Sequence, residues 1–169
     1  MRTLRVLRLL LWEDCQRDCQ GCCNKDWDLI TLETLGNFTG YDQILLTGGE
    51  PMMYTCDLID AIDDIKKQTK TPIYIYTADV SEPLKVMGIL GMVAGLTLTL
   101  HNQEDILPFL LFNSIFGIAP PDKSMRLNVF KGVKLPDVNL DGWTVKRDIE
   151  WIKNCPLPKG EVFRRYDDI

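Results

Sequence analysis

Residues 43–51 read Gln-Ile-Leu-Leu-Thr-Gly-Gly-Glu-Pro, a short apolar run that ends in two glycines, a glutamate and a proline. A run of this length, rich in Ile and Leu and closed by turn residues, is typical of a strand buried on both faces. Two glycines let the backbone turn sharply, and the proline removes a backbone donor. We therefore predict a strand over residues 43–47 and a loop after it that is open to ligands, because ligands approach a parallel sheet at that end.

Further apolar runs of the same kind alternate with segments of helical period. The other predicted strands cover residues 4–12, 72–77, 95–101 and 125–130. Apolar residues recur at helical spacing over residues 58–65, 84–90 and 106–116. This alternation predicts parallel strands with right-handed crossovers, hence an α/β fold. We expect a partial (β/α) barrel of about five to six parallel strands, open on one side, because so few strands cannot close it.

The C-terminal part of the chain has weaker patterns. We expect residues 143–153 to be helical, with a sixth strand over residues 143–152 as the alternative. The polar segment 156–169 shows no clear period.

Size and charge narrow the classes of protein. A chain of 169 residues with 46% hydrophobic content is expected to form a single domain, residues 1–169. A net charge of -5 argues against an extensive nucleic-acid surface. Arg5 and Arg8 interrupt the first apolar run, and no run is long enough to span a bilayer, so we expect a soluble, cytoplasmic protein without a membrane partner.

The cysteines gather in the loop after the first predicted strand. Four of the six are Cys15, Cys19, Cys22 and Cys23, a crowding rare in disulfide frameworks and more typical of metal or redox sites. Three thiolates can hold a four-iron cubane and leave one iron open, for which the methionine amino and carboxylate groups of S-adenosylmethionine (SAM) are suitable ligands.

A structural zinc site is the alternative. Cys23 would supply the fourth ligand, although the side chains of adjacent cysteines diverge and strain a tetrahedron. With a cluster, we expect Cys23 to be a packed thiol beside it. Cys56 and Cys155 have no second ligand nearby in sequence, and we expect them to be ordinary, partly buried cysteines.

The spacing Cys15-x₃-Cys19-x₂-Cys22 after one strand, followed by Gly-Gly-Glu-Pro after the next, resembles the radical SAM superfamily. The resemblance implies that the three cysteines hold a 4Fe–4S cluster whose unique iron chelates SAM. It implies that the glycine motif receives the SAM amino group through Gly48, Gly49, Glu50 and Pro51. Further SAM contacts are expected where later strands end, with candidates Thr77, Asp79, His101 and Asn128.

Several of these positions have ordinary structural alternatives. His101 could equally be a strand-end residue that is hydrogen-bonded to a neighbouring loop. Asn128 could be a residue whose side chain forms hydrogen bonds with backbone groups. The family's adenine-binding GxIxGxxE sequence has no clear counterpart here. Gly21 stands where the family often has an aromatic residue before the third cysteine, and Trp27 either supplies an aromatic face near the cluster or packs at the barrel rim.

The resemblance implies a reaction in which a one-electron reductant such as flavodoxin or ferredoxin drives cleavage of SAM. The products are methionine and a 5′-deoxyadenosyl radical, which abstracts hydrogen from a substrate. No side chain needs to act as an acid or base.

Two weaker resemblances concern the substrate. Residues 19–27 are similar to the activases that put a glycyl radical on anaerobic ribonucleotide reductase, with the spacing to Trp27 one residue short. Residues 46–51 are similar to 7-carboxy-7-deazaguanine synthases, which rearrange a pterin. Three hypotheses follow: an enzyme acting on a protein partner, an enzyme acting on a small molecule, and a non-enzymatic zinc-binding module.

Overall fold

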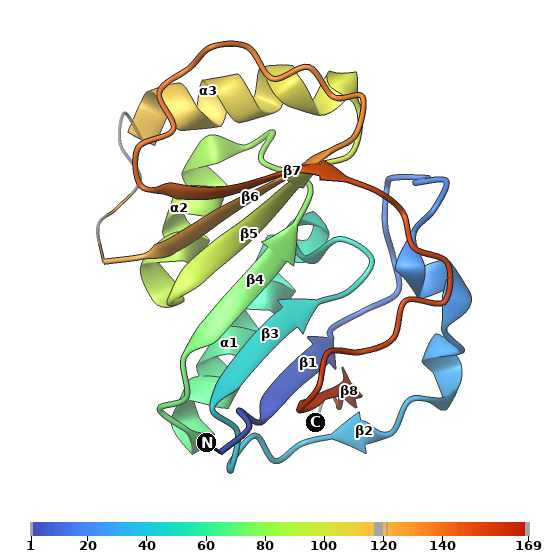
Figure 1. The fold of residues 1–169 in the computed structure, drawn as a ribbon. Coiled ribbons are helices and arrows are strands. Elements are labelled where there is room, and N and C mark those ends of the chain that lie inside the picture. Colours follow the sequence, from blue (N-terminus) through green and yellow to red (C-terminus); the bar gives the residue numbers. More distant parts are fainter. Residues whose placement is uncertain (1, 117–119, 121, 168–169) are drawn as a thin grey trace. The chain divides into compact units, whose positions relative to one another are not determined.

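The computed structural model describes residues 2–116, 120 and 122–167. They form an α/β fold with an eight-stranded, all-parallel sheet and three α-helices (Figure 1). The chain divides into two compact units. The first unit comprises Met1–Tyr74 and Trp151–Ile169, and the second comprises Ile75–Glu150.

In the first unit, parallel strands lie side by side in the order β2-β8-β1-β3. The strands are β1 (Val6–Leu10), β2 (Thr34–Leu35), β3 (Gln43–Thr47) and β8 (Glu161–Tyr166). The 3₁₀ turns η1 (Cys23–Asp26) and η2 (Leu29–Thr31) lie between β1 and β2, and η3 (Pro51–Tyr54) lies between β3 and helix α1. The C-terminal strand β8 therefore lies directly beside the N-terminal strand β1, on the side away from β3.

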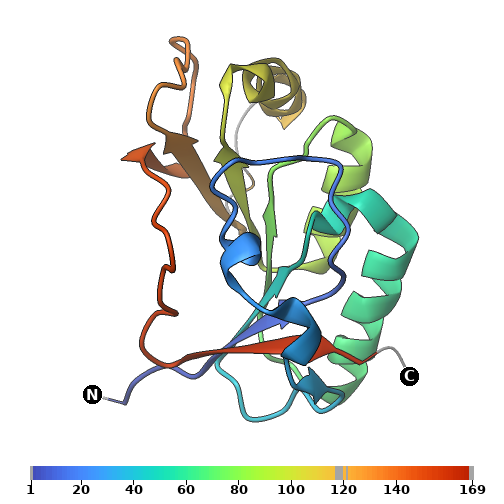
Figure 2. The same cartoon turned by 90° about the vertical axis from the view of Figure 1, so that its right-hand side faces the viewer.

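Helix α1 (Thr55–Gln68) covers one side of the first unit. It lies on the opposite side of β1 and β3 from the chain that leads from residue 151 to β8 (Figure 2). Acidic Asp57 in its first turn and basic Lys66 and Lys67 in its last complement the helix dipole. Its apolar stripe and the strands form the core, in which Leu7, Leu9, Ile44, Leu46, Leu58, Ile62 and Ile65 are fully buried.

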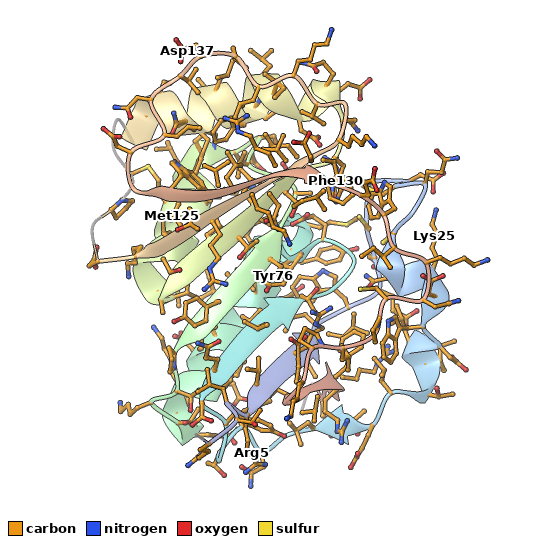
Figure 3. The ribbon with its side chains drawn as sticks, in the orientation of Figure 1. Arg5, Lys25, Tyr76, Met125, Phe130 and Asp137 are labelled. Carbon is orange, nitrogen blue, oxygen red and sulfur yellow. The ribbon has the colours of Figure 1, made fainter. Side chains whose placement is uncertain are left out.

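In the second unit, β5, β6 and β7 are parallel neighbours in that order. Its elements are α2 (Pro83–Met92), β5 (Gly95–Leu100), η4 (Gln103–Asp105), α3 (Ile106–Phe116), β6 (Ser124–Phe130) and β7 (Trp143–Ile149), and the unit boundary falls within β4 (Ile73–Thr77). Figure 3 labels Met125 near the start of β6 and Phe130 at its end. Phe109 and Phe112 of α3 are fully buried and contact the Trp143 ring edge-on, with ring centroids 5.8 and 6.4 Å apart.

The prediction of a parallel α/β fold is confirmed, as are the five predicted strands, whose observed ends differ from the expected ones by at most two residues. No helix in the described ranges is long and apolar enough to cross a bilayer.

The expected helix over residues 143–153 is wrong, and the strand alternative is correct. Trp143 and Val145 are half-buried, whereas Thr144 and Lys146, which each follow one of them, are exposed, and this alternation is the two-residue period of a strand. Thr and Val also favour strands because they branch at Cβ. The contacts of Trp143 with Phe109 and Phe112 of α3 also stabilise the strand.

The expected count of about five to six strands is also wrong, because β2 and β8 were not predicted. In β8 only Phe163 is buried, so the strand lacks an apolar run. In sequence its two arginines are typical of a solvated, polar tail. In the structure they form ion pairs, Arg164 with Glu33 at 3.1 Å and Arg165 with Glu13 at 2.5 Å.

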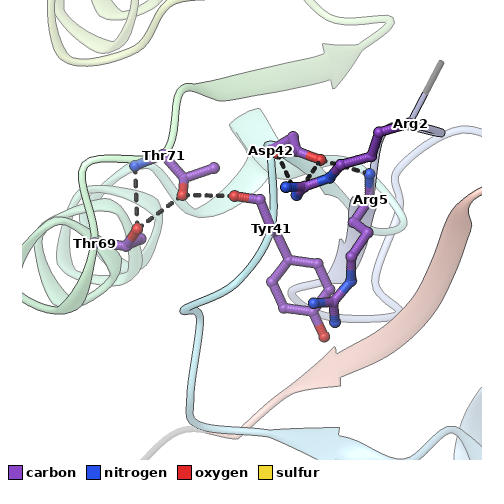
Figure 4. A network of polar contacts seen from close by, with 6 residues as sticks. All are labelled: Arg2, Arg5, Tyr41, Asp42, Thr69 and Thr71. Carbon is purple, nitrogen blue, oxygen red and sulfur yellow. Dashed lines mark hydrogen bonds and ion pairs between the residues drawn. The ribbon is translucent and has the colours of Figure 1, made fainter.

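A polar network fixes the starting ends of β1, β3 and β4 (Figure 4). The Asp42 carboxylate accepts hydrogen bonds from the Arg5 backbone N–H at 2.8 Å and from the Arg2 guanidinium at 3.0 Å. The Thr71 hydroxyl donates to the Tyr41 carbonyl at 3.0 Å and lies 2.8 Å from the Thr69 hydroxyl. These bonds hold the strand register at the end opposite the cysteine loop.

The first prediction concerns the acid stability of this network. The Arg5 backbone hydrogen bond, with charge from Arg2 and Arg5, lowers the pKa of Asp42. A lowered pKa adds stability above the unfolded-state pKa, about 3.9, and this stability is lost as the pH falls through the folded-state value. Asp42→Asn should therefore lower stability at pH 7 and flatten its loss below pH ~4, measured by urea unfolding. Exposed Asp137→Asn is the control, and an Asp42 pKa at or above its ordinary value by NMR would contradict the prediction.

Candidate functional site

Two loops leave the sheet side by side where β1 and β3 end. Leu10 lies opposite Thr47 in the parallel register, so the cysteine loop (residues 11–26) and the glycine loop (residues 48–50) emerge from the same edge. Backbone bonds continue beyond the strands: the Leu11 N–H donates to the Thr47 carbonyl at 2.9 Å, and the Gly49 N–H donates to the Trp12 carbonyl at 2.8 Å. The Glu50 N–H then donates to the Asp14 carbonyl at 2.9 Å.

The glycines are required because the two loops approach so closely. A Cβ atom on Gly48 would lie 2.8 Å from the Trp12 carbonyl oxygen, and one on Gly49 would lie 1.9 Å from the Asp14 carbonyl oxygen. No side chain fits at Gly49 unless the loops separate. The glycine pair thus serves contact between the loops as well as the turn that the sequence predicts.

Three side chains that sequence reasoning missed reinforce this contact. The Trp12 indole N–H donates to the Glu50 carbonyl at 3.0 Å, and the Asn24 amide donates to the Gly48 carbonyl at 2.8 Å. The Tyr54 hydroxyl donates to the Asp14 carboxylate at 2.9 Å, which raises the pKa of Tyr54. The rings of Trp12 and Tyr54 meet edge-on with centroids 5.4 Å apart. Isolated loop residues of this kind have no periodic signal in sequence.

The three predicted cluster ligands are free thiols in the cysteine loop. Cys15 is exposed, and Cys19 and Cys22 are half-buried. The Cys22 N–H donates to the Cys19 carbonyl at 3.2 Å, and the Cys15 sulfur accepts from the Arg17 N–H at 3.4 Å. Burial raises the pKa of Cys15, the Arg17 hydrogen bond opposes it, and the charges of Glu50, Cys19 and Cys22 raise it further. Cys19, Cys22 and the Glu50 carboxylate therefore each lie within electrostatic range of Cys15.

The donor chemistry fits an iron–sulfur cluster, since thiolates are its usual protein ligands and an N–H···S bond such as that of Arg17 tunes them. Among the described side chains, no three of the type His, Cys, Asp or Glu are gathered closely enough to hold a single metal ion.

The outcomes for the other cysteines differ. The side chain of Cys23 lies outside the described part of the structure, so its expected packing beside the cluster stays a prediction. Cys155 is half-buried as expected, whereas Cys56 on α1 is exposed, contrary to expectation. Cys56 lies on a part of the helix surface that the core does not cover.

Glu50 is buried, with 1% of its surface exposed, where the glycine loop ends. Its carboxylate accepts from the Met52 N–H at 3.0 Å and so caps η3, whose first residue is the buried Pro51. The cap fixes the carboxylate in place. A buried, fixed carboxylate beside backbone groups is suited to hold an ammonium group.

Charged and aromatic contacts fasten the outer part of the cysteine loop. Lys25, which points outward in Figure 3, pairs with Asp18 at 2.8 Å, and this bond raises the pKa of Lys25. Arg165 of β8, besides its ion pair with Glu13, donates to the Leu29 carbonyl at 3.1 Å. Trp27 meets Phe163 of β8 edge-on at 5.5 Å, which is the packing alternative for this residue. The C-terminal strand therefore supports the cysteine loop.

Thr77 and Asp79 belong to the second unit and form a local turn after β4. The Thr77 hydroxyl is buried and accepts from the Asp79 N–H at 2.9 Å, and the Asp79 carboxylate accepts from the Ser81 N–H at 2.9 Å. These bonds fix the end of the strand. A role for either residue in binding SAM stays a prediction.

His101 and Asn128 also belong to the second unit. His101 directly follows β5; its backbone N–H donates to Asp105 at 2.7 Å, and its ring lies 4.9 Å from that of Phe130. Asn128 is half-buried within β6, opposite Thr99. The structure thus brings the cysteines and the glycine loop together in the first unit, while the roles of these two residues stay predictions.

Comparisons of the chain with protein families, with curated proteins and with solved structures found no match.

The second prediction tests the contact between the loops. Gly49→Ala places a methyl group on the Asp14 carbonyl and should lower the free energy of unfolding by about 1–3 kcal/mol, the usual cost of overpacking. Gly88→Ala on α2 is the matched control, because its Cβ would meet nothing within 4 Å and alanine favours a helix by up to about 1 kcal/mol. Urea unfolding measures both, and a Gly49→Ala protein as stable as the parent would show that the loops are not in contact.

Proposed function

We propose that this chain is a radical SAM enzyme that holds a 4Fe–4S cluster on Cys15, Cys19 and Cys22. The observation that carries the proposal is the backbone contact between the cysteine loop and the glycine loop, in which the Gly49 N–H binds the Trp12 carbonyl at 2.8 Å. This contact brings together two motifs that lie far apart in the chain, which supports the proposal that they form one site. In the finer architecture that we propose, the parallel strands curve into a partial (β/α) barrel, open on one side.

The proposed roles follow from the donor groups. Cys15, Cys19 and Cys22 would hold the cluster through their thiolates, and the cluster would bind SAM through the amino and carboxylate groups of its methionine part. Backbone groups of Gly48 and Gly49 and the carboxylate of Glu50 receive the SAM ammonium group. Thr77, Asp79, His101 and Asn128 remain the candidates for the rest of SAM.

When bound, the cluster would supply the electron for reductive cleavage of the sulfonium–C5′ bond of SAM, with methionine and a 5′-deoxyadenosyl radical as the products. The electron comes from a reductant such as flavodoxin or ferredoxin. The radical takes a hydrogen atom from substrate, which leaves 5′-deoxyadenosine and a substrate radical. The chain's residues bind and orient SAM and exclude water.

For the substrate we propose a protein partner, as in the glycyl-radical activases, and a small molecule such as a pterin is the alternative. The support for the first is the similarity over residues 19–27 together with the proposed open side of the barrel, which a large substrate would cover. A cytoplasmic location is part of the same proposal.

The third prediction concerns the ligands. Alanine at Cys15, Cys19 or Cys22 should abolish anaerobic assembly of iron and sulfide, because a cluster held by two thiolates has lost a third of its protein ligands. Cys23→Ala and Cys56→Ala should assemble it normally, and the measurement is iron and sulfide content with the visible spectrum.

Two outcomes would contradict this assignment. One is loss of the cluster in the Cys23 variant with retention in the Cys22 variant. The other is a colourless parent protein with stoichiometric zinc, which would favour the zinc-binding module.

The fourth prediction concerns Glu50. Glu50→Gln keeps an oxygen that can cap Met52 but removes the charge, so the loop and the cluster should persist while SAM binds more weakly. Loss of a charged hydrogen bond costs about 1.5–3 kcal/mol, or roughly one to two decades in Kd, measured by equilibrium binding. The control is Glu82→Gln at an exposed position. Unchanged SAM affinity in the Glu50 variant would show that Glu50 only caps η3 and does not bind SAM.

A further inference from the structure

A short C-terminal segment, residues 151–154, lies against the cysteine loop at two points. It joins the end of the second unit to the chain that becomes β8, and it belongs to the first unit with the cysteines. We call residues 151–154 the strap.

The first contact is between the Trp151 side chain and Gly21. A Cβ atom on Gly21 would lie 2.3 Å from Cγ and 2.6 Å from Cδ2 of Trp151, so the indole occupies the space in which a side chain at position 21 would stand. Gly21 lies between Cys19 and Cys22, directly before the latter. An aromatic ring from residue 151 thus fills the place that the loop itself leaves empty.

The second contact is a hydrogen bond from the Asn154 N–H to the Asp26 carboxylate at 2.8 Å. Asn154 has a positive φ of 51°, a conformation that Asn tolerates better than most residues. Asp26 ends η1, which directly follows Cys22. The strap is therefore fastened on both sides of Cys22, at Gly21 by an apolar contact and at Asp26 by a polar one.

We propose that the strap is a positioning element for the cluster ligands, and that the Trp151 ring holds and shields the turn that carries Cys19 and Cys22. Trp151 remains 39% exposed, so the residue contacts the loop at Gly21 and is still partly open to solvent. The assignment of Cys19 and Cys22 as cluster ligands rests on the proposed function. The proposed shielding of the two thiols does not, since it is argued from the contact of Trp151 with Gly21 and from the half-burial of Cys19 and Cys22.

The experiment uses the metal-free, full-length protein under anaerobic, native conditions. Iodoacetamide alkylates accessible thiols, and peptide mass spectrometry gives the rate at each cysteine. Trp151→Ala and, separately, Gly21→Ala should each speed alkylation of Cys19 and Cys22 roughly three- to tenfold, the effect of losing one packed contact on a local opening equilibrium. Exposed Cys56 on α1 is the internal reference and should not change.

Two further variants separate the contact from general loosening. Trp151→Phe keeps a ring and should stay near the parent rate. The double change Gly21→Ala with Trp151→Ala should react no faster than Trp151→Ala alone, because both changes remove the same contact. If Trp151→Ala does not fold, Gly21→Ala decides the question, since it adds one methyl group to a loop.

Unchanged rates at Cys19 and Cys22 in the Gly21 variant would overturn the proposal, as would an equal acceleration at Cys56.

Cluster assembly is measured in a separate experiment, so that a failure of the proposed function can be told from a failure of the proposal for the strap. A protein that takes up no cluster but shows the alkylation pattern would refute the proposed function and leave the strap intact. If the parent protein assembles the cluster but the metal-free variants show unchanged alkylation, the proposed function stands and the proposal for the strap is refuted.

Discussion

The backbone contact between the cysteine loop and the glycine loop is the constraint on which the proposed site depends. It follows from the parallel register of β1 and β3, which brings both loops out at one edge, and from two glycines that let backbone meet backbone. The side chains of Trp12, Asn24 and Tyr54 then close the contact from both sides. As a result, the loop that carries the three thiols contacts the loop that ends at the buried Glu50, although the two segments lie about thirty residues apart in sequence.

The C-terminal part of the first unit gives the cysteine loop its outer support. Strand β8 pairs with β1, and from it Phe163 packs on Trp27 and Arg165 holds Glu13 and the Leu29 carbonyl. A loop that carries metal ligands has few buried apolar side chains of its own, so its order must come from neighbouring elements. In this chain that order comes from the C-terminal segment, although the proposed ligands lie near the N-terminus.

The sequence predicted five of the strands and the two motifs that follow β1 and β3, because apolar runs, cysteine spacing and paired glycines are local signals. The expected burial on both faces is seen in β3 and β5, whereas β4 and β6 alternate between buried and less buried residues. Sequence reasoning missed β8, since Arg164 and Arg165 find their acidic partners only in the folded chain. It predicted a helix in place of β7, where Trp143 packs against Phe109 and Phe112 of helix α3. The contact of Trp151 with Gly21 was equally out of reach, because residues 130 positions apart leave no pattern in a single sequence.

Formation of 5′-deoxyadenosine tests the central claim most directly. The protein, reconstituted anaerobically with iron and sulfide, would be incubated with SAM and a strong one-electron reductant, and the nucleoside and methionine would be quantified. The account predicts equal amounts of both products, slow formation by the chain alone, and none after alanine replaces Cys15, Cys19 and Cys22. A reconstituted iron–sulfur protein that leaves SAM intact, or a triple variant that still cleaves it, would contradict the account.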